Sequence, residues 1–331
     1  MADRMDGPRA EQIASAFVRA IAAAEAFRGA TSPNPPVGCV VLDAQGRELA
    51  CAAHQKAGEG HAEALALAQC RRDGTTARIH TVVVTLEPCN HTGRTPPCCD
   101  AILATPARAV WIGAADPNGQ VRGGGAARLR DAGLRVESSL AGAGCAELIA
   151  PFATRMTKGR PYVTIKQALD NNGSMIPPVG QKTFTSASSL LLAHRLRKRS
   201  DAIVTGSGTV LADDPHFTVR HVPDHPGKRR GLFILDRRQR VPEHYISGSR
   251  ARGFDVRVVA DFAEALRLAH EAGALEVLVE AGPAVTSHIL KTGPWDEHII
   301  IRKGQGADGT DLVEHHTSQH TEEDDHVFRH R

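Results

Sequence analysis

The pattern of apolar and polar positions divides the chain into two alternating series of helices and strands. The first series opens at residues 10–27, where Ile13, Phe17 and Ile21 recur at helical spacing. The prolines at 33–36 end this helix, because proline fixes φ and lacks a backbone donor. Strands are then expected at 37–42, 47–53, 81–86, 109–113 and 134–137, and helices at 61–71, 97–103, 124–132 and 141–155. This alternation predicts a layered α/β domain with a largely parallel region.

A second alternating series follows a linker expected at residues 157–161. Its expected strands are 162–167, 202–205, 231–235, 256–259, 276–279 and 298–301, and its expected helices are 186–199, 262–272 and 284–291. Residues 314–331 contain many His, Glu, Asp and Thr residues but almost no apolar ones, which is typical of a disordered tail. We therefore predict one α/β domain at 1–155, a second at 160–313, and a tail at 314–331.

Composition narrows the class of protein. A chain of 331 residues is too long for one ordinary core, which agrees with two domains. A net charge of +3 shows no concentrated basic footprint, and 4% aromatic residues offer few platforms for stacking bases, so no nucleic-acid partner is expected. No window approaches the ~20 apolar residues of a membrane span, and no membrane partner is expected.

The cysteines indicate a reducing compartment. There are seven, an odd number, and the first residues show no charged and apolar leader pattern. We therefore expect a cytoplasmic protein, in which clustered cysteines are more often metal ligands than disulfides.

One cluster has the pattern of a catalytic zinc site. It combines His61-Ala62-Glu63, at the start of a predicted helix, with Cys89 and Cys98, which follow a predicted strand. One imidazole and two thiolates leave a tetrahedral zinc ion one open position, and zinc in such a site lowers the pKa of water to roughly 7. Glu63 lies two residues from His61, so it can reach that water without being a ligand and can carry its proton to a leaving amine.

A structural zinc site is the alternative. It would need a fourth ligand, for which Cys99 and His91 are the nearby options. Because Cys99 directly follows Cys98, the two side chains point in different directions on a helix and can rarely bind one ion. The pattern therefore favours catalytic zinc. Nucleoside deaminases have Pro-Cys-x-x-Cys, whereas eight residues separate Cys89 from Cys98 here.

Together with Ser32-Pro33-Asn34-Pro35 and the run 54–58, these motifs resemble the bifunctional riboflavin-biosynthesis deaminase–reductases. The resemblance implies a cytidine-deaminase-like α/β/α domain followed by a dihydrofolate-reductase-like α/β domain. The first would deaminate a diaminohydroxypyrimidinone that carries a phosphoribosylamino group, and the second would reduce the ribose to ribityl with NADPH. The substrate-binding residues that it implies in the first domain are Asn34, His54, His91 and Arg94.

The second domain resembles the same family in pieces, at 160–166, 197–203, 205–220 and 279–283. The resemblance implies that Arg197 and Arg220 hold the ribose phosphate, where a guanidinium can bind bidentately, and that Glu280 also binds substrate. The cofactor-binding residues that it implies are Ala168, Thr183, Thr209, Asp213 and Gly282. Gly282 belongs to a strand-to-helix turn, and the free N–H groups of such a turn can hold phosphate oxygens.

Three differences from the family pattern predict weak reduction relative to deamination. The run Asp170-Asn171-Asn172-Gly173 stands where the family has Ser-Leu-Asp-Gly, and it adds a carboxylate near an anionic cofactor. Thr183 replaces a tryptophan, which removes apolar contact. The chain also lacks the strand sequence that follows residues 299–306 in the family, which would leave a sheet edge exposed.

The leading hypothesis is thus a zinc-dependent pyrimidine deaminase with a reductase-like second domain, acting on a small-molecule pyrimidine ribotide as a homodimer or higher homo-oligomer. One alternative keeps both activities in full. Two others are a deaminase of nucleic-acid bases, which the scarcity of aromatic residues disfavours, and a non-catalytic zinc scaffold, which would not need Glu63.

Overall fold

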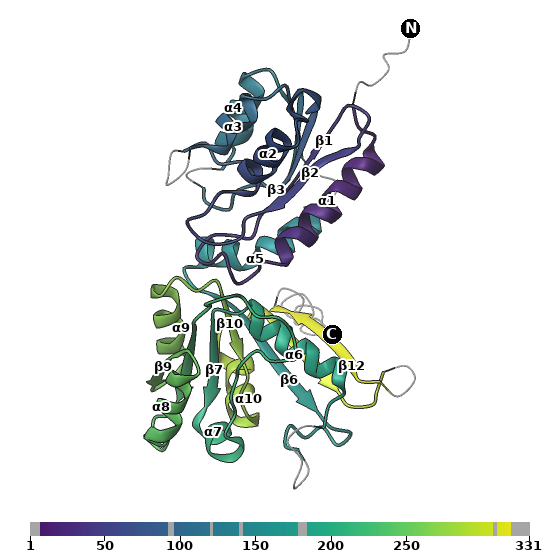
Figure 1. The fold of residues 1–331 in the computed structure, drawn as a ribbon. Coiled ribbons are helices and arrows are strands. Elements are labelled where there is room, and N and C mark those ends of the chain that lie inside the picture. Colours follow the sequence, from purple (N-terminus) through teal and green to yellow (C-terminus); the bar gives the residue numbers. More distant parts are fainter. Residues whose placement is uncertain are drawn as a thin grey trace, which may run out of the picture. The chain divides into compact units, whose positions relative to one another are not determined.

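The computed structural model describes residues 7–91, 96–119, 122–138, 142–177, 184–306 and 310–318. It divides into two compact units, Met1–Lys158 and Gly159–Arg331, each an α/β fold (Figure 1). The α/β class predicted for both halves is confirmed. Arg94 and Thr183 lie outside the described residues.

The first unit is built on a five-stranded sheet with the order β2-β1-β3-β4-β5. Strand β1 is antiparallel to β2 and β3, whereas β3, β4 and β5 are parallel, as expected for part of this domain. The strands are β1 (Gly38–Leu42), β2 (Glu48–Ala53), β3 (Thr81–Leu86), β4 (Ala109–Ala114) and β5 (Arg135–Ser138). The helices are α1 (Ala10–Glu25), α2 (Ala62–Arg72), the short 3-10 helix η1 (Thr76–Arg78), α3 (Cys98–Leu103), α4 (Gly124–Asp131) and α5 (Gly142–Lys158).

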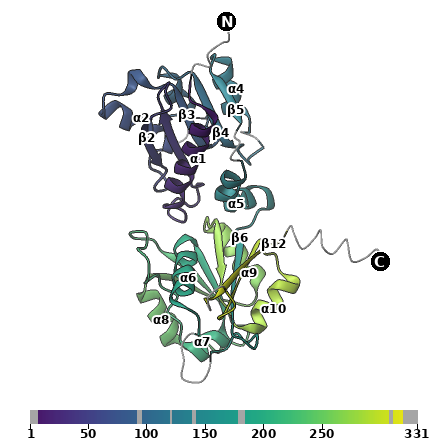
Figure 2. The same cartoon turned by 90° about the vertical axis from the view of Figure 1, so that its right-hand side faces the viewer.

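Helices cover both faces of this sheet and bury its two apolar sides. Phe17 of α1 and Cys145 of α5 pack with Val83 on one face. Leu67 of α2, Ile102 of α3 and Leu129 of α4 pack on the other. The result is a three-layer α/β/α unit, which Figure 2 shows from a second direction.

The second unit is built on a seven-stranded sheet with the order β12-β11-β6-β10-β7-β8-β9. All neighbouring strands are parallel except β11 and β12. The strands are β6 (Tyr162–Leu169), β7 (Ala202–Gly206), β8 (Arg230–Leu235), β9 (Phe254–Val259), β10 (Glu276–Val279), β11 (Glu297–Arg302) and β12 (Leu312–Thr317). The helices are α6 (Ala187–Arg199), α7 (Ser207–Asp213), α8 (Glu243–Ala251), α9 (Phe262–Glu271) and α10 (Pro283–Thr292).

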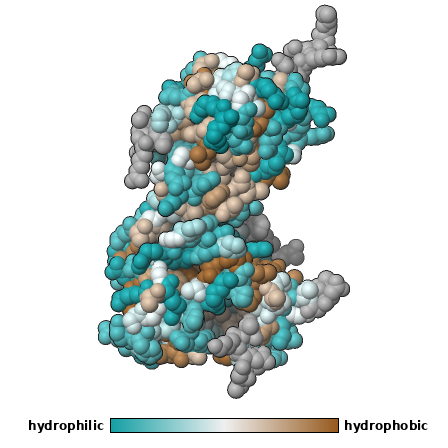
Figure 3. Space-filling model, in the orientation of Figure 1, coloured by the Kyte–Doolittle hydropathy of each residue, from teal (hydrophilic) through white to brown (hydrophobic). Residues whose placement is uncertain are grey.

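Two apolar clusters flank this sheet. Phe262 of α9 and Ile289 of α10 pack with Ile165 of β6 on one face, and Leu196 of α6 and Tyr245 of α8 pack on the other. Most of the face drawn in Figure 3 is hydrophilic, in keeping with this burial of apolar residues. Among the described helices, none is long and apolar enough to cross a membrane.

The structure departs from the expectations at several points. Residues 314–317 were expected to be disordered but belong to β12. This strand pairs with β11, from Glu297 opposite Thr317 to Arg302 opposite Leu312. A strand therefore does follow residue 306, and it forms the edge of the sheet beside β11. Helices α7 and α8 were not expected, and α5 extends to Lys158 through part of the expected linker.

Candidate zinc centre and cofactor cleft

Helix α2 places one predicted ligand and the predicted proton carrier at its first turn. His61 is the N-cap residue of α2 and has extended backbone angles, so the chain enters the helix directly after it. Glu63 follows in the first turn and is only 3% exposed. The Ala- and Leu-rich helix packs against the sheet, and this fixes both side chains.

The two cysteines come from the segment between β3 and α3. Cys89 lies shortly after β3, and Cys98 is the first residue of α3. The backbone N–H of Cys98 donates to Sγ of Cys89 over 3.3 Å. Gly125 of α4 approaches the carbonyl oxygen of Pro88 so closely that a Cβ there would lie 2.0 Å from it, so α4 supports the cysteine segment.

The three predicted ligand atoms fit a zinc ion. Nδ1 of His61 lies 3.3 Å from Sγ of Cys98 and 3.6 Å from Sγ of Cys89, and all three atoms lie within 4.8 Å of one another. Bonds of about 2.3 Å to sulfur and 2.1 Å to nitrogen in a tetrahedron separate these atoms by about 3.6 Å. Cys99 instead directs its thiol to the carbonyl oxygens of Pro88 and Gly125, away from this group.

The electrostatics of the cluster agree with a metal site. The hydrogen bond between the two thiols lowers the pKa of Cys89 to about 4 and raises the pKa of Cys98, so one thiolate forms readily beside His61. Burial raises the pKa of the Glu63 carboxyl above its ordinary value. A raised pKa makes a carboxylate a better proton acceptor, which suits a group that must carry a proton.

A cavity of about 530 Å³ opens onto these residues. Its wall includes the predicted substrate-binding residues Asn34, His54 and His91 together with His61, Glu63 and Cys89. The structure thus brings together the predicted site residues of the first unit that it describes. Cys98 is buried beside His61 and Cys89 and is not itself part of the cavity wall, and Arg94 is not described.

His54 and Asn34 orient one another at this wall. Nδ1 of His54 donates to the carbonyl oxygen of Gly60 over 3.1 Å, so its Nε2 is the acceptor for the Asn34 amide, 3.3 Å away. Burial lowers the pKa of His54 and keeps this neutral form at neutral pH. The amide oxygen of Asn34 is thereby left for a ligand, and it suits the donor edge of a pyrimidine.

Sequence reasoning gave no role to three acidic or amide residues near this wall. Glu87 is buried and accepts hydrogen bonds from the N–H groups of Gly123 and Ala126 at the start of α4. Asp116 and Asn118 line the cavity, and burial raises the pKa of Asp116. The run Asp116-Pro117-Asn118 was the available signal for the last two, whereas Glu87 gives no local signal because its partners are 36 and 39 residues away.

The second unit has a cleft where open parallel sheets bind ligands. Strands β10 and β7 are neighbours in the sheet. After β10 the chain returns to the sheet as β11 on one side of this pair, whereas after β7 it returns as β8 on the other side. Ligands of such sheets lie outside the carboxyl ends of strands at this switch point. Two predicted cofactor-binding residues meet there, since the N–H of Gly282 donates to Oγ1 of Thr209 over 2.9 Å.

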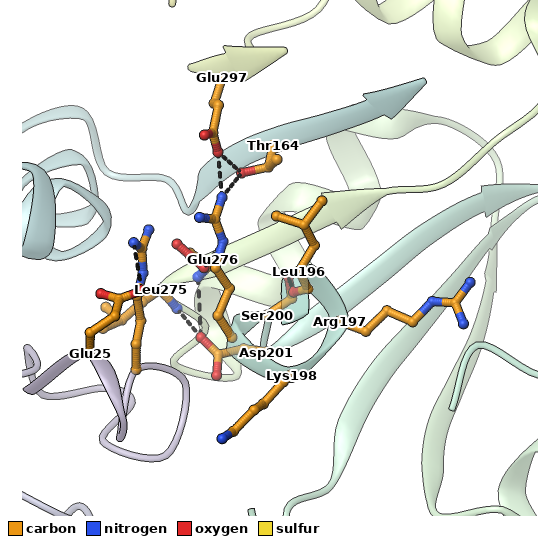
Figure 4. Close-up of polar contacts among 12 residues, drawn as sticks. Glu25, Thr164, Leu196, Arg197, Lys198, Ser200, Asp201, Leu275, Glu276 and Glu297 are labelled. Carbon is orange, nitrogen blue, oxygen red and sulfur yellow. Dashed lines mark hydrogen bonds and ion pairs between the residues drawn. The ribbon is translucent and has the colours of Figure 1, made fainter. Parts of the chain in front are cut away.

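Three predicted substrate-binding residues of this unit lie close together. Arg197 of α6 forms a two-fold ion pair with Glu280, at 2.5 and 2.8 Å, and its Nη1 donates to the carbonyl oxygen of Thr218. Nη1 of Arg220 donates to Oγ1 of that same Thr218 over 2.7 Å. In Figure 4 the Arg197 side chain points away from the separate polar network of Thr164, Glu276 and Glu297.

Glu280 also holds a lysine that the sequence analysis did not single out. Nζ of Lys166, on β6, lies 3.2 Å from Oε2 of Glu280. Burial alone would raise the pKa of Glu280, but Arg197 and Lys166 lower it to about 2. The carboxylate therefore stays charged and anchors both cations.

The other residues of this unit that the sequence analysis named differ in burial and in their contacts. Ala168 is two residues beyond Lys166 on β6 and therefore shares its face, where it packs against the cluster around Leu196. Asp213 is the exposed last residue of α7. Oδ1 of Asp170 accepts hydrogen bonds from the N–H groups of Asn172 and Ser174, both 2.8 Å, so this carboxylate is engaged within its own turn.

These two sites define a zinc-dependent deaminase joined to a nucleotide-dependent reductase, and comparison with known proteins gives the family. Residues 10–114 match the cytidine and deoxycytidylate deaminase zinc-binding region, and residues 161–303 match the RibD C-terminal domain. The riboflavin biosynthesis protein RibD of Aquifex aeolicus is 34% identical, over 85% of this chain and 84% of its own. RibD of Escherichia coli is 35% identical, over 86% and 85%.

Solved structures of RibD proteins are similar to this chain over both units. Acinetobacter baumannii RibD (form 1) has a TM-score of 0.76 at 30% identity and covers 89% of this chain and 87% of its own. A Thermotoga maritima protein described as a diaminohydroxyphosphoribosylaminopyrimidine deaminase and 5-amino-6-(5-phosphoribosylamino)uracil reductase has a TM-score of 0.75 at 29% identity, over 91% and 90%. The chain belongs to the RibD family of riboflavin-biosynthesis enzymes and carries both its zinc-dependent deaminase domain and its NADPH-dependent reductase domain.

Proposed function

We propose that this chain performs two successive steps on one pyrimidine ribotide. The first unit replaces the ring amine of a 2,5-diamino-6-(ribosylamino)pyrimidin-4-one, phosphorylated on the ribose, by a carbonyl oxygen and releases ammonia. The second unit reduces the ribose to ribityl. The observation that carries the proposal is the buried Glu63 beside the group of His61, Cys89 and Cys98, at one wall of a 530 Å³ cavity.

Each residue of the deaminase site has a definite task in this proposal. His61, Cys89 and Cys98 would hold zinc, which when bound acts as a Lewis acid and lowers the pKa of water. Glu63 takes the proton of the attacking water and delivers it to the departing amine. The amide of Asn34, fixed by His54, aligns the pyrimidine edge. His91, exposed at the rim, and Arg94 suit the phosphate.

The reductase unit would hold NADPH along the carboxyl ends of β7, β8 and β10. Gly282 and Thr209 lie at the switch point, and Ala168, Asp213 and Thr183 are the further residues proposed to contact the cofactor. A cavity of about 270 Å³ beyond β8 is lined by Ser207, Arg237 and Arg238. Within the described residues no ion pair engages these two arginines, so they suit the dianionic phosphate that distinguishes NADPH from NADH.

The chemistry of reduction needs a hydride and a proton. NADPH when bound supplies the hydride. Lys166, which is held by Glu280, would deliver the proton to the ribose ring oxygen as the sugar ring opens, and Arg197 and Arg220 would bind the sugar phosphate. Two of the three grounds for weak reduction carry less weight, because β12 extends the sheet beyond residue 306 and the Asp170 carboxylate is engaged within its own turn. We propose that both reactions occur.

The remaining proposals concern the setting of the enzyme. We propose a homodimer or higher homo-oligomer, because β12 forms an edge of the seven-stranded sheet and unpaired edge groups can pair with another chain. Light scattering after size exclusion tests it. We also propose a cytoplasmic location, supported by seven cysteines that form no disulfide. We propose no nucleic-acid or membrane partner, supported by the net charge of +3 and by the absence of a membrane-spanning helix among the described residues. Fractionation of cells tests the location.

Ammonia release tests the deaminase proposal against its alternatives. The pyrimidine ribotide, its dephosphorylated form, cytidine and a single-stranded deoxycytidine oligonucleotide are compared at equal concentration. We expect turnover of the ribotide and slower turnover of the dephosphorylated form. A preference for the oligonucleotide would favour a nucleic-acid deaminase, and no turnover of any substrate by zinc-loaded protein would favour a scaffold.

A further inference from the structure

His194 of α6 is a fully buried residue with one paired and one unpaired ring nitrogen. Its exposed fraction is 0%, and its Nδ1 accepts the backbone N–H of Arg220 over 2.9 Å. A backbone N–H can only donate, so Nδ1 carries no proton and the neutral ring must be protonated at Nε2. Nε2 has no hydrogen-bond partner within the described structure. The His221 ring lies edge-to-face at 4.6 Å between centroids.

An unpaired buried donor is unfavourable, and this indicates what the ring does. If His194 only filled space, an apolar side chain of similar size would pack there without the desolvated Nε2–H. The imidazole has one feature that an apolar side chain lacks, the acceptor at Nδ1. That acceptor fixes the backbone at Arg220.

The segment that contains Arg220 depends on such side-chain contacts. Residues 214–220 contain no helix or strand, and Asp214 and Phe217 have left-handed φ angles of 42° and 55°. Non-glycine residues seldom adopt these angles unless their surroundings hold them. Here the Tyr245 hydroxyl holds the carbonyl oxygen of Pro215 at 2.6 Å, and the Arg197 guanidinium lies over the Phe217 ring.

The hydrogen bond to His194 secures the far end of that segment. Its consequence reaches two proposed phosphate-binding residues, because Thr218 is hydrogen-bonded to both Arg197 and Arg220. Arg197 is also three residues from His194 on α6, so both lie on one face of the helix.

We propose that His194 is a positioning residue for the substrate phosphate: its Nδ1 fixes the backbone of Arg220 and so holds the Arg220 guanidinium beside Thr218 and Arg197. The inference rests on the proposed function, in which these arginines bind the ribose phosphate. The acceptor persists at neutral pH, since burial, together with the nearby Arg197, His221 and Arg220, lowers the pKa of His194 to about 4 against the opposing effect of Glu280.

Two amide variants test the geometry directly. In His194→Asn the amide oxygen can take the position of Nδ1, whereas in His194→Gln the extra methylene moves it toward the position of Nε2. His194→Leu removes the acceptor, and Arg220→Ala removes the guanidinium. Each full-length variant is titrated with ribose 5-phosphate and ribose by calorimetry, and its KM and kcat for reduction are measured. Ammonia release by the first unit serves as the control for intact protein.

We expect His194→Asn to bind ribose 5-phosphate within about threefold of the unmodified chain. His194→Gln and His194→Leu should bind about tenfold more weakly, with a raised KM and little change in kcat. Unchanged binding in His194→Leu, or equal losses in the Asn, Gln and Leu variants, would overturn the role of His194 while Arg220→Ala remained weak. Unchanged binding in Arg220→Ala would instead overturn the proposed phosphate site itself.

Discussion

Sγ of Cys89 accepts a hydrogen bond from the backbone N–H of Cys98, 3.3 Å away, although eight residues separate the two along the chain. The long insertion therefore leaves the relation between the two ligands intact, because the end of β3 and the start of α3 hold them. This pairing explains how a site with a longer spacing than Pro-Cys-x-x-Cys still has two thiols beside His61.

Zinc binding should depend on Cys89 but not on the neighbouring Cys99. Cys89→Ser removes one of three ligands, and we expect strong loss of zinc by metal analysis. Cys99→Ser is the matched control, because that thiol donates to the carbonyl oxygens of Pro88 and Gly125 and is not one of the three clustered ligands, so this variant should keep one zinc per chain. Full zinc retention in Cys89→Ser would refute the ligand assignment.

Glu63 should be needed for chemistry and not for metal binding. Glu63→Gln keeps the shape of a side chain that is 3% exposed but cannot carry a proton. We expect retained zinc and a loss of ammonia release on the order of 10²–10⁴. A rate near that of the unmodified chain would show that another group moves the proton.

The arginines beyond β8 should determine the choice of cofactor. Replacing both Arg237 and Arg238 with Ser removes two cations from the wall of the 270 Å³ cavity. We expect affinity for 2',5'-ADP to fall roughly ten- to a hundredfold, about 1–3 kcal/mol, and affinity for 5'-AMP to change little. Calorimetry measures both, and deamination is the control. Equal losses for the two ligands would point to general damage of the cleft.

The stability of the second unit should fall in mild acid. Burial lowers the pKa of His298 to about 4, from an ordinary value of 6.5. The unfolded chain therefore takes up the proton first, so the contribution of His298 to stability is complete above pH 6.5 and is lost as the pH falls toward 4. His298→Gln can still donate to Gln167 but does not titrate, so urea unfolding should depend less on pH in this variant. An unchanged dependence would contradict the assignment.

Short-range patterns were sufficient to name the residues of the deaminase site. His61 and Glu63 lie at the start of one helix and the cysteines bracket one segment, so each half of the site could be recognised from its local pattern. The contacts that join the two halves bridge 28 and 37 residues and depend on tertiary packing. The reductase site depends on longer range. Arg197 and Glu280 could be named from resemblance, but their ion pair joins residues 83 apart and depends on how α6 packs beside β10.

The structure also contains one strand, β12, that no local sequence pattern predicts. Strand β12 has only Leu312 and Val313 as apolar residues, so its sequence looks like a polar tail. Pairing with β11 and the ion pair of Glu314 with Arg302 stabilise it instead. An edge strand needs no buried face when its partner strand supplies the hydrogen bonds. Hydrophobic periodicity therefore does not predict such a strand.

The central claim is that one chain first deaminates and then reduces a pyrimidine ribotide, and mass spectrometry of its products tests this most directly. The zinc-loaded chain is incubated with the diaminopyrimidine ribotide, with and without NADPH, beside Glu63→Gln. The account predicts the deaminated ribosyl product without NADPH and, with NADPH, a product that carries two further hydrogens. Glu63→Gln should yield neither. Deaminated product alone in the presence of saturating NADPH would contradict the reductase half, and unchanged substrate in both reactions would contradict the whole.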